Sequence, residues 1–262
     1  MKVRFSNFKG GWICRLERIF FLALIWLPAV AQNLPRDESG LPLNTLSEAE
    51  KSAGWKLLWD GKTAQGWRGA RLDQFPAFGW KMENGILSVV ESGGLESRNG
   101  GDIITEKLYG NFELSLEFKL TPGANSGIKY FVLPVQPRQT GSAIGLEYQV
   151  LDDDKHPDAK AGVGGNRTVS SLYDLIPAGN KKAKPIGEWN HARIAVDGSR
   201  VEHWLNGVRV VEYNRHAQVF RALIQKSKYK EYPDFGQIPE GHILLQDHGN
   251  LVSFRNIKIR EF

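Results

Sequence analysis

Apolar and polar residues alternate along most of the chain, which is the pattern of β-strands with one buried face. The alternation is clearest from Phe112 to Leu120, where apolar side chains fill every second position. Similar stretches recur from Trp55 to the C-terminus, with turn residues between them. Two turns contain Asn-Gly, at Asn84-Gly85 and Asn206-Gly207, and suit hairpins whose central residues take positive φ. The pattern predicts antiparallel strands with one face in a core and the other in solvent.

Helical periodicity is limited to two places. The stretch "HAQVFRALIQKSKYK", residues 216–230, puts Val219, Leu223 and Ile224 on one side and ends in lysines, as is typical of a helix C-terminus. For this basic tail we favour a solvated helix end over contact with an acidic ligand. A shorter helical piece is expected at "SEAEKSA", residues 47–53. The whole pattern predicts an all-β protein, an antiparallel β-sandwich of jelly-roll type with one peripheral helix.

The N-terminus has the features of an export signal. Five basic residues precede "IFFLALIWLPAVA", an uncharged run from Ile19 to Ala31 that ends in the A-x-A of a cleavage site. The run is short for a bilayer span, so cleavage near Ala31 is favoured over a membrane anchor. We therefore expect a periplasmic or secreted protein without membrane contact after cleavage. Residues 1–31 are then the signal peptide, 32–54 an N-terminal linker and 55–262 the domain.

Most of the positive charge belongs to this leader. Of the 34 basic and 29 acidic residues, five basic and one acidic lie within residues 1–31. The mature chain is therefore close to neutral and offers no electrostatic basis for binding nucleic acid. The one cysteine, Cys14, also lies in the leader, so disulfides and thiol catalysis are excluded from the mature chain.

The stretch "GLEYQVLDDDKHPDAKAG", residues 145–162, carries the strongest candidate chemistry. Alternation puts Glu147 and Gln149 side by side on the face turned away from the core. A solvated polar pair fits this position as well as a binding site does. The neighbouring strand, "SGIKYFVL", places one of two pairs beside them: Lys129 and Phe131, or Ile128 and Tyr130.

An ordinary retaining glucanase is a poor match to this strand. Glu147, Gln149 and Asp152 have a spacing similar to the E-x-D-x-x-E pattern of glucanases with this fold. Here an amide replaces the middle carboxylate, and Asp152 reaches the same face only through a bulge. Double displacement needs two carboxyl groups about 5–5.5 Å apart, which this strand supplies poorly.

The acidic residues that follow have two interpretations. Asp152 and Asp153 offer oxygen ligands to a divalent metal such as calcium, but the loop lacks the helix-loop-helix calcium pattern, so a solvated turn is favoured. His156 precedes a proline that fixes the loop, and an imidazole there is suited to act as a general base near neutral pH.

Three further residues complete the candidates. Trp204, in "VEHWLNG", either stacks on a sugar ring or belongs to the core. His248 follows Gln246 at the alternate position of "LLQDHG", and Arg255 lies on the last strand. The chain has no Gly-rich phosphate loop, H-E-x-x-H or G-x-S-x-G motif.

A family resemblance rests on motifs in a fixed order that cover nearly all of residues 55–262. The motifs are "GWKLLWDGKTAQGWRG", "GDIITEKLYGNFELSLEFKL", "NSGIKYF", "GLEYQVLDDDKHPDA", "SLYDLI", "GEWNHARI", "VEHWLNGVRVVEY" and "ILLQDHGNLVSFRNIKIREF". The chain resembles the 3-keto-disaccharide hydrolase domain family of exported bacterial proteins, which implies a concanavalin-like jelly roll. One departure is "NSGIKYFV", where the family pattern carries an arginine, as in "NSGIYFR". Lys129 or a cation from elsewhere in the chain takes its place.

The resemblance implies a carbohydrate substrate oxidised to a ketone at ring position 3, supplied by an upstream sugar 3-dehydrogenase. A single base then removes the proton at position 2, and the glycosidic oxygen leaves from position 1. The sequence offers Glu147 or His156 as this base. Candidates for stabilising the enolate are Lys129, His248 and Arg255, or a divalent metal on Asp152 and Asp153. Candidates for binding the substrate are Gln149, Trp204, Arg255 and Tyr130. A non-catalytic lectin-like module on the same sandwich is the alternative.

Overall fold

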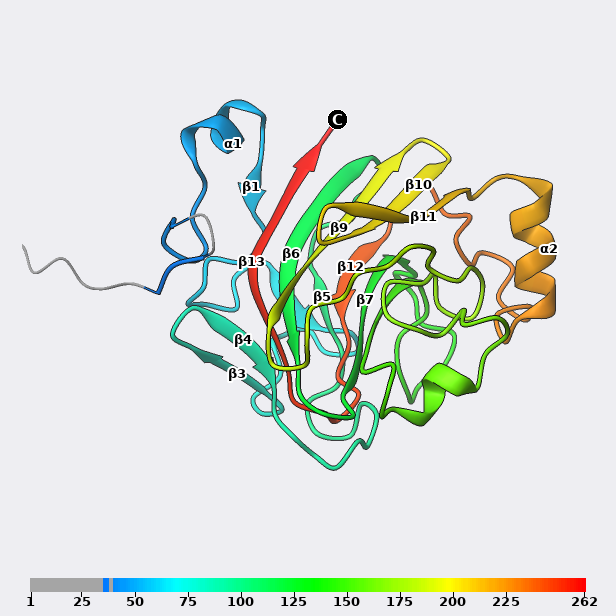
Figure 1. The fold of residues 1–262 in the computed structure, drawn as a ribbon, viewed down its shortest axis with the longest axis horizontal. Helices are drawn as coiled ribbons and strands as arrows, with labels where there is room; N and C mark the ends of the chain where they lie inside the picture. The colour runs from blue at the N-terminus through cyan, green and yellow to red at the C-terminus, as the bar shows by residue number, and fades with distance from the viewer. Residues whose placement is uncertain (1–34, 38–39) are drawn as a thin grey trace, which may run out of the picture. The chain divides into compact units, whose positions relative to one another are not determined.

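Two antiparallel sheets form the protein, as the computed structural model shows for residues 35–37 and 40–262 (Figure 1). The larger sheet has the order β11-β10-β9-β6-β13-β4-β3, with β1 paired to β13, and the smaller has the order β2-β5-β12-β7-β8. Their strands are β1 (Lys56–Leu57), β2 (Trp67–Gly69), β3 (Trp80–Glu83), β4 (Ile86–Val89), β5 (Ile103–Thr105), β6 (Phe112–Leu120), β7 (Asn125–Val132), β8 (Leu146–Leu151), β9 (Trp189–Asp197), β10 (Arg200–Leu205), β11 (Val208–Asn214), β12 (His242–Leu245) and β13 (Val252–Glu261). The predicted antiparallel sandwich is confirmed. The predicted signal peptide lies outside the described residues.

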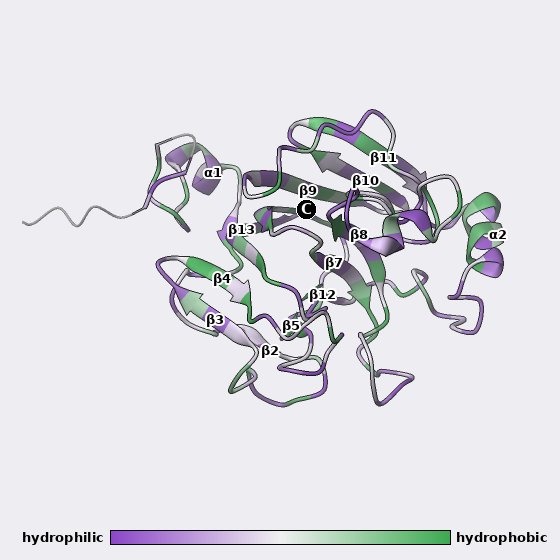
Figure 2. Ribbon diagram, turned by 60° about the horizontal axis from the view of Figure 1, so that its bottom comes forward, coloured by the Kyte–Doolittle hydropathy of each residue, from purple (hydrophilic) through white to green (hydrophobic). Residues whose placement is uncertain are grey.

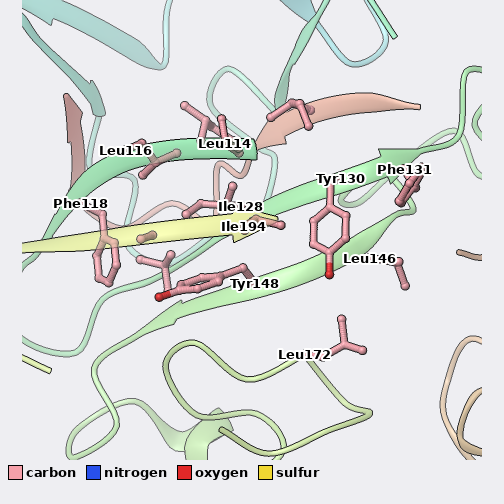
Figure 3. Packing of buried hydrophobic residues seen from close by; sticks show 14 of the residues in the cluster. Leu114, Leu116, Phe118, Ile128, Tyr130, Phe131, Leu146, Tyr148, Leu172 and Ile194 are labelled. Atoms are coloured by element: carbon pink, nitrogen blue, oxygen red, sulfur yellow. The ribbon is translucent and has the colours of Figure 1, made fainter. Parts of the chain in front are cut away.

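The core lies between the two sheets, where side chains of β6 and β9 face those of β7 and β8 (Figure 3). The ring of Phe118 on β6 meets Tyr148 on β8 edge to face, with centroids 6.5 Å apart. Such an aromatic pair contributes about 0.5–1.5 kcal/mol beyond its buried area. Along β9, buried positions alternate with half-buried ones, and both hydrophobic and hydrophilic residues occur along the strands of the sheets (Figure 2). The two Asn-Gly turns join β3 to β4 and β10 to β11, and all four turn residues have positive φ.

The outer face of the larger sheet differs from the solvent-facing surface that alternation predicts. Glu113 on β6 is only 5% exposed, because Arg193 and Arg260 pair with its carboxylate. Long arginine stems on the neighbouring strands cover the sheet, so polar residues are buried on this side as well. The expectation of a solvated face is therefore wrong for this part of β6.

A bulge in β7 determines which side chains reach the outside of the smaller sheet. Lys129 pairs with Leu244 of β12 and Val132 with His242, so Tyr130 and Phe131 together oppose one residue. Phe131 has φ of 48°, and both rings enter the core (Figure 3). Alternation from Lys129 already turns Tyr130 into the core, and the bulge turns Phe131 into the core as well, so Lys129 alone of the three stays on the outer face.

The helices are short. The helix α1 (Glu48–Ser52) begins at a capping box made by Ser47 and Glu50, which confirms the short helical piece expected there. The helix α2 (Gln218–Lys226) is shorter than residues 216–230 and lies outside both sheets (Figure 1). Phe220 and Ile224 are buried, whereas Val219 is 69% exposed, so the side that Val219 shares with Leu223 and Ile224 is buried only in part. In the described part of the chain, no helix has the length and apolar character to cross a membrane.

Candidate active site

A cavity of about 430 Å³ opens on the face of the smaller sheet that is turned away from the core. The sheet supplies its floor through Lys129 of β7 and Glu147 and Gln149 of β8. Irregular segments supply the walls: Glu96, the loop between β7 and β8, the loop after β8, the segment after α2 and the segment after β12. The structure therefore brings together five of the residues predicted for the site, namely Glu147, Gln149, Lys129, His156 and His248.

Glu147 lies at the centre of this floor. Its carboxylate is 3.5 Å from the Lys129 ammonium, directly across the β7–β8 pair. With its amide turned so that the nitrogen faces Glu147, Gln149 donates to this carboxylate at 3.2 Å. Its side chain lies over Gly127, where a Cβ atom would approach Glu147 Oε1 to 2.3 Å. Glu147 is only 5% exposed, so the polar pair is enclosed rather than solvated.

The environment of Glu147 changes its proton affinity. Burial raises the pKa of its carboxyl above the ordinary value, while the charges of Lys129 and Lys228 oppose the shift. The charges of Glu96 and Asp102 add to the increase. A carboxylate whose pKa is moved toward neutrality is a stronger base than an ordinary glutamate and suits proton abstraction from carbon.

Lys129 is fixed by a buried network. Its ammonium donates to the hydroxyl of Ser142 and to the carbonyl of Ala143 at 3.1 Å, in addition to facing Glu147. Asp102 anchors the other side by accepting from the Ser142 hydroxyl at 2.6 Å and from the Ala143 N–H at 2.8 Å. With three directions of the ammonium engaged, Lys129 contributes a fixed positive charge to the site.

Two histidines form another part of the wall. The rings of His156 and His248 meet edge to face, with centroids 5.7 Å apart. His156 precedes a short 3₁₀ helix (Pro157–Lys160), and its Nδ1 accepts from the N–H of Asp158 at 3.2 Å. The proton of the neutral ring therefore lies on Nε2. Burial, and then the nearby His248, lower the pKa of His156, so at neutral pH the ring is an uncharged hydrogen-bond donor.

Sequence reasoning missed a second lysine of the site. Lys228 follows α2 and is an exposed residue that lines the cavity; its ammonium lies 4.4 Å from the ring centroid of Tyr173 and 5.3 Å from that of Tyr229. Desolvation lowers its pKa, against the attraction of Glu147. The basic tail is exposed as expected, but the expectation did not include the place of Lys228 in the cavity lining. Nothing in the run of alternate lysines separates it from Lys226 and Lys230.

The remaining wall residues are joined by hydrogen bonds and an ion pair. Asp158 accepts from the Tyr173 hydroxyl at 2.8 Å and from Arg167 at 2.9 Å. Arg138, on the loop after β7, donates to the carbonyl of Ser142 at 3.3 Å and lines the cavity. An arginine thus reaches the site from the loop, next to the strand where the family pattern carries one.

Three predicted substrate-binding residues lie elsewhere. Tyr130 is fully buried, and its hydroxyl contacts His203 and Tyr213 in the core. Trp204 is on β10 of the other sheet, where its indole N–H donates to Glu202 at 2.9 Å. Arg255 is on β13, also of the other sheet, where it pairs with Glu117. Their assignment to the site is corrected: alternation along β7 turns Tyr130 to the core, and Trp204 and Arg255 belong to the other sheet.

Asp152 and Asp153 do not fit a metal site. Asp152 accepts from the backbone N–H groups of Gly123, Asp154 and Lys155 and so closes the turn after β8. Asp153 accepts from the N–H of Val169 and pairs with Lys181. Their carboxylate oxygens are already used, and neither residue lines the cavity that holds Glu147. Within residues 35–37 and 40–262, no group of three or more His, Cys, Asp or Glu is placed to hold a metal ion.

The fold and the cavity define a β-sandwich protein with an enzyme-like site, because a buried carboxylate, two lysines and two histidines converge where binding alone needs no titratable groups. The chain belongs to the 3-keto-alpha-glucoside-1,2-lyase-like domain family, whose model matches residues 54–260. The predicted family is thereby confirmed.

Relatives and solved structures agree with this membership. The chain is 38% identical to the 3-keto-disaccharide hydrolase of Bacteroides thetaiotaomicron, over 88% of this chain and 86% of that protein. A candidate glycosyl hydrolase of Parabacteroides distasonis superposes with a TM-score of 0.73 at 30% identity, covering 84% of this chain and 99% of that one. A second candidate glycosyl hydrolase of that organism has a TM-score of 0.59 at 27% identity, over 79% and 99%.

Proposed function

We propose that the protein cleaves the glycosidic bond of 3-keto-glycosides, 3-keto-disaccharides among them, by proton abstraction and β-elimination. The observation that carries the proposal is a buried glutamate on the floor of the cavity, Glu147, with Lys129 beside it and Lys228 in the wall. The family and the 38% identical relative named 3-keto-disaccharide hydrolase support the same substrate class.

The reaction needs one base and positive charge near the ketone. The ketone at C3 acidifies the C2–H bond, and Glu147 takes that proton while the bond's electrons form the C2=C3 enolate. The enolate then restores the C3 ketone, forms a C1=C2 double bond and expels the glycosidic oxygen, which takes up a proton. Addition of water across the double bond completes a net hydrolysis, in which the sugar and the leaving group gain one water between them.

The residues of the cavity fit these steps. Glu147 is the better base of the two predicted, because the Nδ1 lone pair of His156 is already occupied by the N–H of Asp158. Lys129 supplies a fixed positive charge, and Lys228, whose ammonium contacts aromatic rings, is placed to bind the enolate oxygen. The Nε2–H of His156 is available to the departing oxygen. Gln149 orients the carboxylate of Glu147.

Double displacement by two carboxylates has weaker support. Asp152, the second carboxylate of a glucanase-type pair, closes the turn after β8 and does not line the cavity. Asp158 does line it, but Arg167 and Tyr173 engage both of its oxygens.

Export, and a dehydrogenase that oxidises C3 before this enzyme acts, complete the proposal. The elimination requires the ketone, and the N-terminal sequence has the pattern of an export signal.

The test compares a 3-keto-glucoside carrying a chromogenic aglycone with its unoxidised parent, using residues 32–262. We expect release from the keto sugar alone, slowed by deuterium at C2. Glu147→Gln should lower kcat by about 10²–10⁴-fold while retaining binding, because the general base is lost. Glu188→Gln, an exposed glutamate outside the cavity, is the matched control.

The opposite outcomes are distinct. Cleavage of the unoxidised parent at a similar rate would refute the elimination chemistry, and sugar binding without any release would leave a lectin. Loss of activity in the presence of a chelator would mean that a divalent metal, and not the lysines, stabilises the enolate.

A further inference from the structure

A second cavity of about 460 Å³ lies beside the first and is not used by the reaction described above. Three segments line it: residues 69–72 at the end of β2 and just after it, the stretch from Glu96 to Asp102 before β5, and the tip of the β7–β8 loop at 139–141. Glu96 lines both cavities. The two spaces therefore adjoin one another at this residue.

The wall between the cavities is one hydrogen-bonded pair thick. Ser142 lines the first cavity and Asp102 the second, and the Ser142 hydroxyl donates to Asp102 at 2.6 Å. The same loop contributes Arg138 to the first cavity and Thr140 to the second. A ligand held in the second cavity is thus close to the lysine that Ser142 binds, Lys129.

The lining of the second cavity matches a sugar ring. Ala70, Leu72 and several glycines present an apolar surface, as the C–H faces of a pyranose require. Hydroxyl groups at the ring edge would meet the side chains of Glu96 and Arg98, which are exposed residues of the lining. Charges of both signs favour a neutral polyhydroxylated ligand over an ion.

We infer that the second cavity binds the leaving group of the substrate, a second sugar ring, while the 3-keto ring occupies the first. The inference rests on the proposed function and adds the place and chemical class of the leaving group. Arg71 donates to the carbonyls of Arg138 and Thr140 at 3.3 and 3.4 Å, so the loop that separates the two sites is held in position.

The test fills the second cavity without touching the first. Thr140→Trp places an indole at the lining, and Val135→Trp, on the same loop but 82% exposed and outside both cavities, is the control. We compare kcat/KM for a 3-keto-disaccharide with that for methyl 3-keto-glucoside, whose leaving group is too small to occupy the second cavity. Thr140→Trp should lower the disaccharide value by about ten-fold or more and leave the methyl glycoside within about two-fold. Val135→Trp should change neither.

Each other result has one meaning. An equal loss on both substrates, or no loss on either, overturns the assignment of the leaving group while the proposed function stands. A wild-type protein inactive on both substrates refutes the proposed function and the inference with it. Circular dichroism and the melting temperature of both variants verify that they fold.

Discussion

At the scale of single residues, Gly127 fixes the place of the candidate base. Its Cα lies under the Glu147 side chain, and an added Cβ would meet Oε1 at 2.3 Å and Cδ at 2.9 Å. Because these atoms are the end of a flexible side chain, Gly127→Ala should move the carboxylate rather than unfold the strand. A displacement of about 1 Å lowers the rate by about 10²-fold. We expect a fall of that order in kcat with KM little changed, measured by steady-state kinetics.

Two comparisons show whether Gly127 acts through Glu147. In a Glu147→Gln background, Gly127→Ala should add little further loss, because both changes remove the same function. Gly179→Ala is the control, since a Cβ there meets its nearest atom at 3.9 Å and lies outside the cavity. Equal and additive losses in both backgrounds would contradict a positioning role for Gly127.

The pH dependence of the reaction belongs to the same scale. Glu147 must be ionised to accept a proton, so kcat/KM should be low at acid pH and rise as the pH passes the raised pKa of Glu147. The Lys228 charge opposes the increase in this pKa, and Lys228→Met should therefore move the acid limb to higher pH. Lys230→Met, two residues further along and outside the cavity, should leave the limb in place. If the acid limb of the pH profile stays unchanged in Lys228→Met, the charge of Lys228 does not act on the pKa of the base.

At the scale of elements, alternation predicted the two faces of β8 but not what covers them. Glu147 and Gln149 do lie opposite Leu146, Tyr148 and Val150. The covering segments are irregular, and their positions follow from contacts that have no periodic signal. The faces of β7 could not be predicted either. Strict alternation keeps Lys129 and Phe131 together, whereas a register shift against β12, more than a hundred residues away, sends Phe131 into the core.

At the scale of the whole molecule, strand patterns and turn residues were sufficient for the fold class, and the ordered motifs for the family. They were not sufficient to place Trp204 and Arg255. Which strand joins which sheet depends on long-range pairing that single-strand patterns do not encode. The same limit applies to residues 32–54, expected to be a linker. Asn44 is 5% exposed and exchanges hydrogen bonds of 2.7 and 2.9 Å with Asn256 of β13, so the described part of this segment is attached to the sandwich.

This attachment makes a prediction about the stability of the whole domain. Asn44 has φ of 54°, which glycine adopts without strain, so Asn44→Gly removes the side-chain hydrogen bonds to Asn256 and Gly85 and little else. Leaving the buried N–H of Asn256 without its acceptor should lower the free energy of unfolding by about 1–3 kcal/mol, measured by urea denaturation. Asn180→Gly, at an exposed position with φ of 53°, is the matched control. Turnover by folded Asn44→Gly should equal wild type, because Asn44 lies outside both cavities. Equal stability of the two variants would show that residues before Trp55 only lie against the domain and do not support it.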